Sequence, residues 1–194
     1  LLAILAVRNP TVNTLRRIYI LGFCAAGVGF TTYAMVSVVY WLLRFPGGTA
    51  DDLIRAAATL LVCLPLWGIT WQRVQALFYD GEDGERASVL RKFYLYLAVF
   101  VSVTLAVIGL TTLLAGLLRR SVQLAAQGDW RLPVAVVIVL GVQWLFHGHA
   151  LERDAHAAPE GPKQAGIRRL YYYLLAGIGL AAFLVGLGGA ASVV

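Results

Sequence analysis

The chain of 194 residues alternates long apolar runs with short polar segments. The five apolar runs cover residues 18–43, 56–71, 93–118, 132–146 and 170–194. As helices rising ~1.5 Å per residue, the three long runs reach about 38 Å, enough to cross a ~30 Å hydrocarbon core with some tilt. The two short runs reach only about 24 Å and need flanking residues to complete a span. The pattern predicts an all-α polytopic transmembrane helix bundle with about five spans.

One short motif begins each of the three long runs. Residues 15–19 (LRRIY) recur as residues 90–94 (LRKFY) and as residues 167–171 (IRRLY), at spacings of 75 and 77 residues. A motif that returns at a fixed period is the sequence signature of tandem repeats. The three copies therefore predict that a unit of one long and one short span is repeated along the chain.

Markers in the short runs share this register. Trp67 and Trp144 are 77 residues apart, and so are Asp52 and Asp129. Since each unit holds two spans, successive units enter the membrane from the same side, which makes the repeat parallel rather than inverted. We predict a single transmembrane domain over residues 1–194, with repeat units at approximately 15–89, 90–166 and 167–194, the third of them incomplete.

Both ends of the chain are apolar. Residues 1–7 carry no basic start of the kind that a signal peptide has, and residues 190–194 end without a polar cap. These ends favour the interpretation that the sequence is a slice of a longer protein.

Composition supports the membrane interpretation. The chain is 60% hydrophobic and 13% charged, against about 25% charged residues in soluble domains, and its mean hydropathy is +0.76. The net charge of +6 is explained by basic residues at the ends of the spans, and no polar domain is present to hold a nucleic acid. The expected partners are therefore membrane lipids and other integral membrane subunits or further copies of the chain, with no nucleic acid.

The basic residues also predict an orientation. Eleven Lys and Arg residues lie on one side of the predicted spans and five on the other. The positive-inside rule places the richer side, and with it the N-terminus, in the cytoplasm. The predicted lipid and topology anchors are the basic pairs of the three motifs, namely Arg16, Arg17, Arg91, Lys92, Arg168 and Arg169.

Residues 64–68 (LPLWG) and 85–96 (ERASVLRKFYLY) carry a resemblance to a known family. The chain resembles an uncharacterised family of bacterial multi-pass membrane proteins, known only as a domain of unknown function. The resemblance implies a multi-pass protein of the bacterial cytoplasmic (inner) membrane and implies no activity. The family pattern ends its short span in His-Trp, whereas this chain has Thr70-Trp71 in the first unit and His147-Gly148 in the second.

The candidate chemistry lies in the short runs. His147 and His149 point about 200° apart on a helix, so they do not chelate one metal ion, and no metal site is predicted. A single histidine could bind haem or a pigment, with Trp144 one turn earlier as a stacking neighbour, so His147 and Trp144 are the candidate cofactor-binding residues. No cofactor is required by the sequence, and no catalytic residues are predicted.

Small residues recur at helical spacing in the long runs. Such stripes allow close helix packing, within this chain or against another subunit. The runs hold no Asp, Glu, Lys or Arg at bilayer-central positions, which argues against ion-coupled transport. The predicted helix-packing residues are Gly22, Ala26, Ala98, Ser102, Ala106, Ala182, Gly186 and Ala190.

These features give three functional hypotheses. The favoured one is a non-catalytic structural or accessory subunit that packs against other membrane proteins. The first alternative is a small-solute transporter or channel, for which a polar path beside Gln143 and Thr59 would be evidence. The second alternative is a pigment- or haem-binding membrane subunit.

Overall fold

The computed structural model describes residues 10–79, 89–124, 128–157 and 162–191. The apolar ends at residues 1–7 and 192–194, and the first part of the family motif at residues 85–88, lie outside them. The regular structure of the described residues consists of five α-helices, and none of it is a strand. These helices are α2 (Pro10–Arg44), α3 (Ala50–Tyr79), α5 (Val89–Ser121), α6 (Arg131–Ala157) and α7 (Pro162–Ala191).

Each of the five helices is long and apolar enough to cross a membrane. The predicted all-α polytopic bundle with five spans is therefore confirmed. The difference between long and short runs, however, does not extend to the helices. α3 and α6 have 30 and 27 residues, close to the 35, 33 and 30 residues of α2, α5 and α7. The short apolar runs are short because α3 and α6 carry polar residues at their ends, within the helix.

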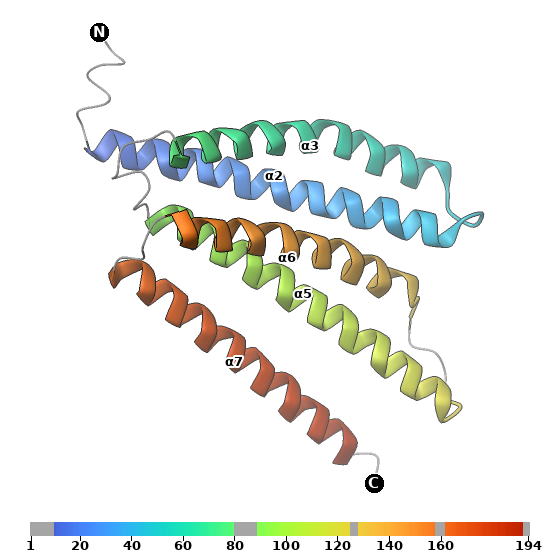
Figure 1. The fold of residues 1–194 in the computed structure, drawn as a ribbon. Coiled ribbons are helices and arrows are strands. Elements are labelled where there is room, and N and C mark those ends of the chain that lie inside the picture. The colour runs from blue at the N-terminus through green and yellow to red at the C-terminus, as the bar shows by residue number, and fades with distance from the viewer. Residues whose placement is uncertain (1–9, 80–88, 125–127, 158–161, 192–194) are drawn as a thin grey trace.

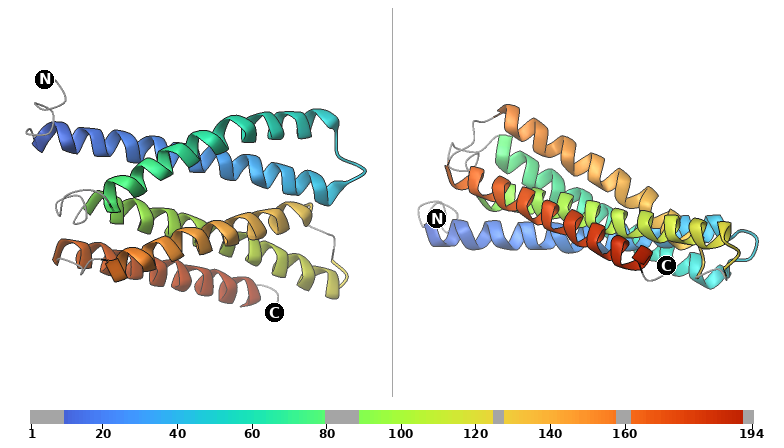
Figure 2. Two further views of the ribbon diagram at one scale, coloured as in Figure 1. Left: turned by 45° about the horizontal axis from the view of Figure 1, so that its top comes forward. Right: turned by 90° about the horizontal axis from the view of Figure 1, so that it is seen from below.

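The helices pack as two antiparallel hairpins with one further helix at the edge. α2 pairs with α3 and α5 pairs with α6, while α6 also packs on α2 and α7 packs on α5 (Figure 1). α2, α5 and α7 run in one direction, and α3 and α6 run in the other (Figure 2). These are the helix directions that the predicted parallel two-helix units require.

The ends of the hairpins are fixed by local contacts. In the first hairpin the Trp41 Nε1 atom donates a hydrogen bond to the Thr49 carbonyl at 2.8 Å, and a Cβ atom on Gly48 would lie 2.6 Å from the Trp41 ring. In the second, Asp129 caps α6, where its Oδ1 atom accepts from the Arg131 backbone N–H at 3.1 Å. This backbone hydrogen bond, together with one from the Tyr40 hydroxyl, holds the pKa of Asp129 below its usual value.

α2 and α3 approach each other closely at Gly27 of α2. A Cβ atom there would lie 3.2 Å from the Trp67 Cβ atom and 3.3 Å from the Trp67 Cα atom of α3. Since part of this contact is to backbone, a side chain at position 27 requires the two helices to separate. The predicted packing residues Gly22 and Ala26 are exposed, and a Cβ atom on Gly22 would meet nothing within 4 Å.

We expect Gly27→Ala to destabilise the detergent-purified protein by about 1–3 kcal/mol, because the added methyl group overpacks the contact with Trp67. Gly22→Ala is the matched control, and we expect it to leave the stability unchanged or raise it, since alanine favours a helix. Unfolding of each variant followed by circular dichroism measures the difference. Equal effects of the two substitutions would contradict the close contact.

Candidate functional site

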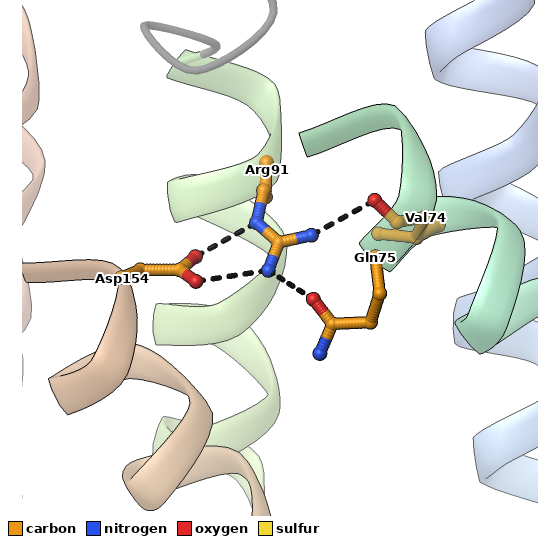
Figure 3. A network of polar contacts seen from close by, with 4 residues as sticks. All are labelled: Val74, Gln75, Arg91 and Asp154. Carbon is orange, nitrogen blue, oxygen red and sulfur yellow. Dashed lines mark hydrogen bonds and ion pairs between the residues drawn. The ribbon is translucent and has the colours of Figure 1, made fainter. Parts of the chain in front are cut away.

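Arg91, near the start of α5, holds three helices together. Its guanidinium group pairs with both carboxylate oxygens of Asp154 of α6, with Nε–Oδ2 at 2.7 Å and Nη2–Oδ1 at 2.9 Å. It also donates to the Val74 carbonyl at 3.0 Å and to the Gln75 Oε1 atom at 2.6 Å, both in α3 (Figure 3). A planar guanidinium fork suits this bidentate geometry, which a lysine cannot reproduce.

This ion pair is buried inside the bundle. Arg91 is 4% exposed and Asp154 1% exposed. Burying two charges is costly, and here the cost is offset because the pair is bidentate and Val74 and Gln75 satisfy further N–H groups. A buried charge within a membrane protein is a candidate functional feature whose partner should be named. Here Arg91 and Asp154 are each other's partners.

Deeper in the bundle, a chain of hydrogen-bonding groups links α2, α5 and α6. The His147 Nδ1 atom lies 3.0 Å from the Gln143 carbonyl, so Nδ1 carries a proton and donates it. The Nε2 atom is then the acceptor for the Tyr94 hydroxyl at 3.4 Å. The Cys24 thiol in turn donates to the Tyr94 oxygen at 3.4 Å. The Cys24 thiol therefore donates to Tyr94, and the Tyr94 hydroxyl donates to His147.

Aromatic rings enclose His147, which is 0% exposed. The rings of Trp71, Phe146 and Tyr94 lie edge-on or tilted around it, with centroid distances of 5.7, 5.2 and 6.0 Å. Trp71 belongs to the first predicted repeat unit and His147 to the second. The His and Trp that the family pattern keeps side by side in one unit are thus brought together in space from two units.

A polar contact continues this chain toward the other end of the bundle. The Thr32 hydroxyl of α2 lies within hydrogen-bonding distance of the Gln143 Oε1 atom of α6. We call Thr32, Gln143, His147, Tyr94 and Cys24 the polar column. Along α6, Gln143, His147 and Asp154 lie about 18, 24 and 35 Å from Arg131 at ~1.5 Å per residue. The column and the ion pair thus occupy much of the depth of the bundle.

A pocket lies between α2 and α3 at the opposite end from the Arg91–Asp154 pair. Its volume is ≈ 440 Å³, within the ~300–1,000 Å³ that ligand pockets usually have. Along α2 its lining runs from Tyr33, which is 67% exposed, to Arg44. Its lining mixes charged, hydroxyl-bearing and aromatic groups, contributed by Tyr33, Ser37, Tyr40, Trp41, Arg44, Asp52, Arg55, Ala56 and Thr59.

The structure separates the two candidate cofactor-binding residues. His147 is inside the bundle, whereas Trp144 is 45% exposed on the surface that faces lipid. Both nitrogens of His147 lie within hydrogen-bonding distance of protein groups, and Tyr94 occupies the space beside Nε2. This arrangement does not favour a haem or a pigment bound between His147 and Trp144. Among the described residues, no three His, Cys, Asp or Glu side chains lie close enough to hold a metal ion.

The predicted basic anchors occupy different environments. Arg91 and Lys92 are buried, Arg17 is half-buried, and Arg16, Arg168 and Arg169 are exposed. Their role in fixing the orientation of the protein stays a prediction.

The predicted packing stripes also differ. In α5, Ala98 and Ser102 are buried and Ala106 is half-buried. Two turns beyond Ser102 on this helix, a Cβ atom on Gly109 would lie 3.1 Å from the Val137 side chain of α6. In α7, Ala182 and Gly186 are exposed, and the Ala190 side chain lies outside the described part of the chain.

Sequence reasoning missed Asp154, Tyr94 and Cys24 as members of the site. A signal for Asp154 was present. Gln143, His147 and Asp154 stand at positions i, i+4 and i+11, which share one face of a helix. These three polar residues therefore form a stripe along one face of α6. Cys24 lies in a continuous apolar run, and no comparable pattern distinguishes it.

These features define an integral membrane protein of several spans with a polar interior. A family model described as a domain of unknown function (DUF5671) matches residues 17–142, more than half of the chain, and the chain belongs to this family. The resemblance seen in the sequence is thereby confirmed. No curated protein and no solved structure matches the chain.

Proposed function

We propose that this protein transports a small polar solute across the membrane. The solute enters the pocket between α2 and α3 and then passes along the polar column. The observation that carries the proposal is that a pocket with a polar lining lies at one end of the bundle, and a buried set of polar side chains from Thr32 to Tyr94 lies deeper within it.

Energetic reasoning supports this proposal over a purely structural role. Polar groups inside a bundle surrounded by lipid are costly unless every one of them is satisfied. Apolar side chains of similar volume often stabilise such an interior as well or better. Two members of this interior, the Thr31 hydroxyl and the Trp67 Nε1 atom, are buried without a hydrogen-bond partner among the described residues. A transported solute or water is a natural partner for such groups.

Uptake into proteoliposomes tests the proposal. Vesicles containing the purified protein are incubated with glycine, urea, acetate or O-phosphoethanolamine, passed over a desalting column, and the retained solute is measured by mass spectrometry. We expect uptake of at least one solute above that of protein-free vesicles, and loss of that uptake in Gln143→Leu. Gln72→Leu, the same substitution at an exposed position of α3, is the control. Uptake no greater than in protein-free vesicles for all four solutes would refute the proposal.

A second candidate function, a membrane subunit that associates through α7, rests on a different observation. α2 and α5 each have a hairpin partner, whereas α7 packs on α5 alone among the described helices. Its exposed Ala182 and Gly186 are spaced for close helix approach. If a second copy of the chain binds there, native mass spectrometry in mild detergent shows a dimer that Gly186→Phe abolishes and Leu184→Phe preserves. A monomer at all protein concentrations would contradict it.

A further inference from the structure

The pocket between α2 and α3 presents three charged side chains. Arg44 and Arg55 each contribute a guanidinium group, and Asp52 contributes a carboxylate. Within the part of the chain that the structure describes, none of these three side chains makes a hydrogen bond or an ion pair, although Arg44 lies over the Tyr40 ring at 5.2 Å and also attracts the Asp129 carboxylate. Both positive and negative groups are therefore available to a ligand in one cavity.

The aromatic walls of the pocket are held in place by contacts outside it. The Trp41 Nε1 atom is bound to the Thr49 carbonyl at 2.8 Å, and the Tyr40 hydroxyl donates to the Asp129 Oδ2 atom at 3.0 Å. The face of the Tyr40 ring is covered by the Arg44 guanidinium in a cation–π contact, so the group left to attract an ammonium is the Asp52 carboxylate. The site therefore combines two guanidinium groups, which bind an anion, with one carboxylate, which binds a cation.

We infer that this pocket binds a zwitterionic group that carries a phosphate and a primary ammonium, as phosphoethanolamine does. Arg44 and Arg55 hold the phosphate, since guanidinium groups form charge-assisted hydrogen bonds with it. Asp52 holds the ammonium. The inference rests on the proposed function in taking this pocket as the solute-binding site, and it names the class of that solute.

Two sources could supply this group. One is a free small molecule, and the other is the headgroup of phosphatidylethanolamine in the surrounding bilayer. The pocket lies at the hairpin end of two membrane-spanning helices, and Trp41 and Tyr40 are residue types that favour the depth of lipid headgroups. The same side chains would bind the group from either source. Two measurements are therefore needed to tell a free molecule from a lipid headgroup.

Calorimetric titration of the detergent-purified protein tests the free source. We expect O-phosphoethanolamine to bind about tenfold or more tightly than inorganic phosphate or ethanolamine alone, because it engages both kinds of charge. Asp52→Asn and Arg55→Gln should each weaken its binding by about tenfold. Arg120→Gln, at an exposed position near the end of α5, is the matched control and should leave the affinity unchanged.

Native mass spectrometry from nanodiscs tests the lipid source. Nanodiscs of equal parts phosphatidylethanolamine and phosphatidylglycerol are used, and we expect retained phosphatidylethanolamine to be lost in Asp52→Asn and Arg55→Gln but kept in Arg120→Gln. Variant-sensitive binding in either measurement supports the inference and identifies the source. Binding in neither, or binding that Asp52→Asn and Arg55→Gln do not change, overturns it.

The binding experiments can fail independently of the uptake experiment that tests the proposed function. Binding that depends on Asp52 and Arg55, in a protein that takes up none of the four solutes into vesicles, leaves the inference standing and refutes transport. Uptake that needs Gln143 but is unaffected by Asp52→Asn and Arg55→Gln leaves transport standing and refutes the inference.

Discussion

Replacing Arg91 by methionine is expected to destabilise the bundle by about 3–5 kcal/mol, because the change leaves the Asp154 carboxylate buried without its counter-charge. The Val74 carbonyl and Gln75 also lose their donor, so contacts from α5 to both α3 and α6 are lost together. Titration of the purified protein with a denaturing detergent, followed by tryptophan fluorescence, measures the loss.

Two further variants show whether the buried charge is the cause. The double variant Arg91→Met with Asp154→Leu removes both charges, and we expect it to recover roughly half or more of the lost stability. Arg169→Met changes an exposed arginine of the third motif and should have an effect within about 0.5 kcal/mol. If Arg91→Met and Arg169→Met were equally mild, the ion pair would contribute nothing to the stability of the fold.

The helices and their order could be predicted because lipid imposes a simple rule on the sequence. A span requires about 20 apolar residues, and the apolar runs are readable without knowledge of any neighbour. The ends of α3 and α6 were less evident. Residues such as Gln75 and Asp154 interrupt the apolar runs, yet they stay within the helices because Arg91 satisfies them there.

The candidate site could not be predicted in the same way, since its members are selected by their neighbours. Arg16, Arg91 and Arg168 occupy the same place in one repeated motif, and a single sequence gives no reason to distinguish them. Of these three arginines only Arg91 is buried, and among the described helices the α5–α6 hairpin that contains it has α2 and α3 on one side and α7 on the other. The position of a unit within the bundle thus determines what its motif does.

The pairing of Trp71 with His147 has the same origin. Each predicted unit holds one half of the His-Trp pattern that the sequence resembles, which from sequence weakens any role that needs both residues. The contact between α2 and α6 brings the two hairpins together, so that α3 supplies the tryptophan and α6 the histidine. A pattern that is incomplete in each unit is complete in the assembled interior.

The second large effect is expected at His147. Replacing it with phenylalanine fills the middle of the polar column with an apolar ring and interrupts the polar contacts between Gln143 and Tyr94. If the column is the route of the solute, we expect uptake into proteoliposomes to fall about tenfold or more, which corresponds to ~1.4 kcal/mol or more on the barrier. His149→Phe, on the same helix but exposed, is the control and should retain normal uptake.

A double-mutant cycle tests the same contact independently of transport. His147→Phe removes the acceptor of the buried Tyr94 hydroxyl, at an expected cost of about 1–3 kcal/mol, and Tyr94→Phe leaves the His147 Nε2 atom without its donor. The double variant leaves neither group unsatisfied, so its cost should fall short of the sum of the two single costs by about 1 kcal/mol. Additive costs would show that Tyr94 and His147 do not interact. Normal uptake in His147→Phe would show that the solute does not pass this residue.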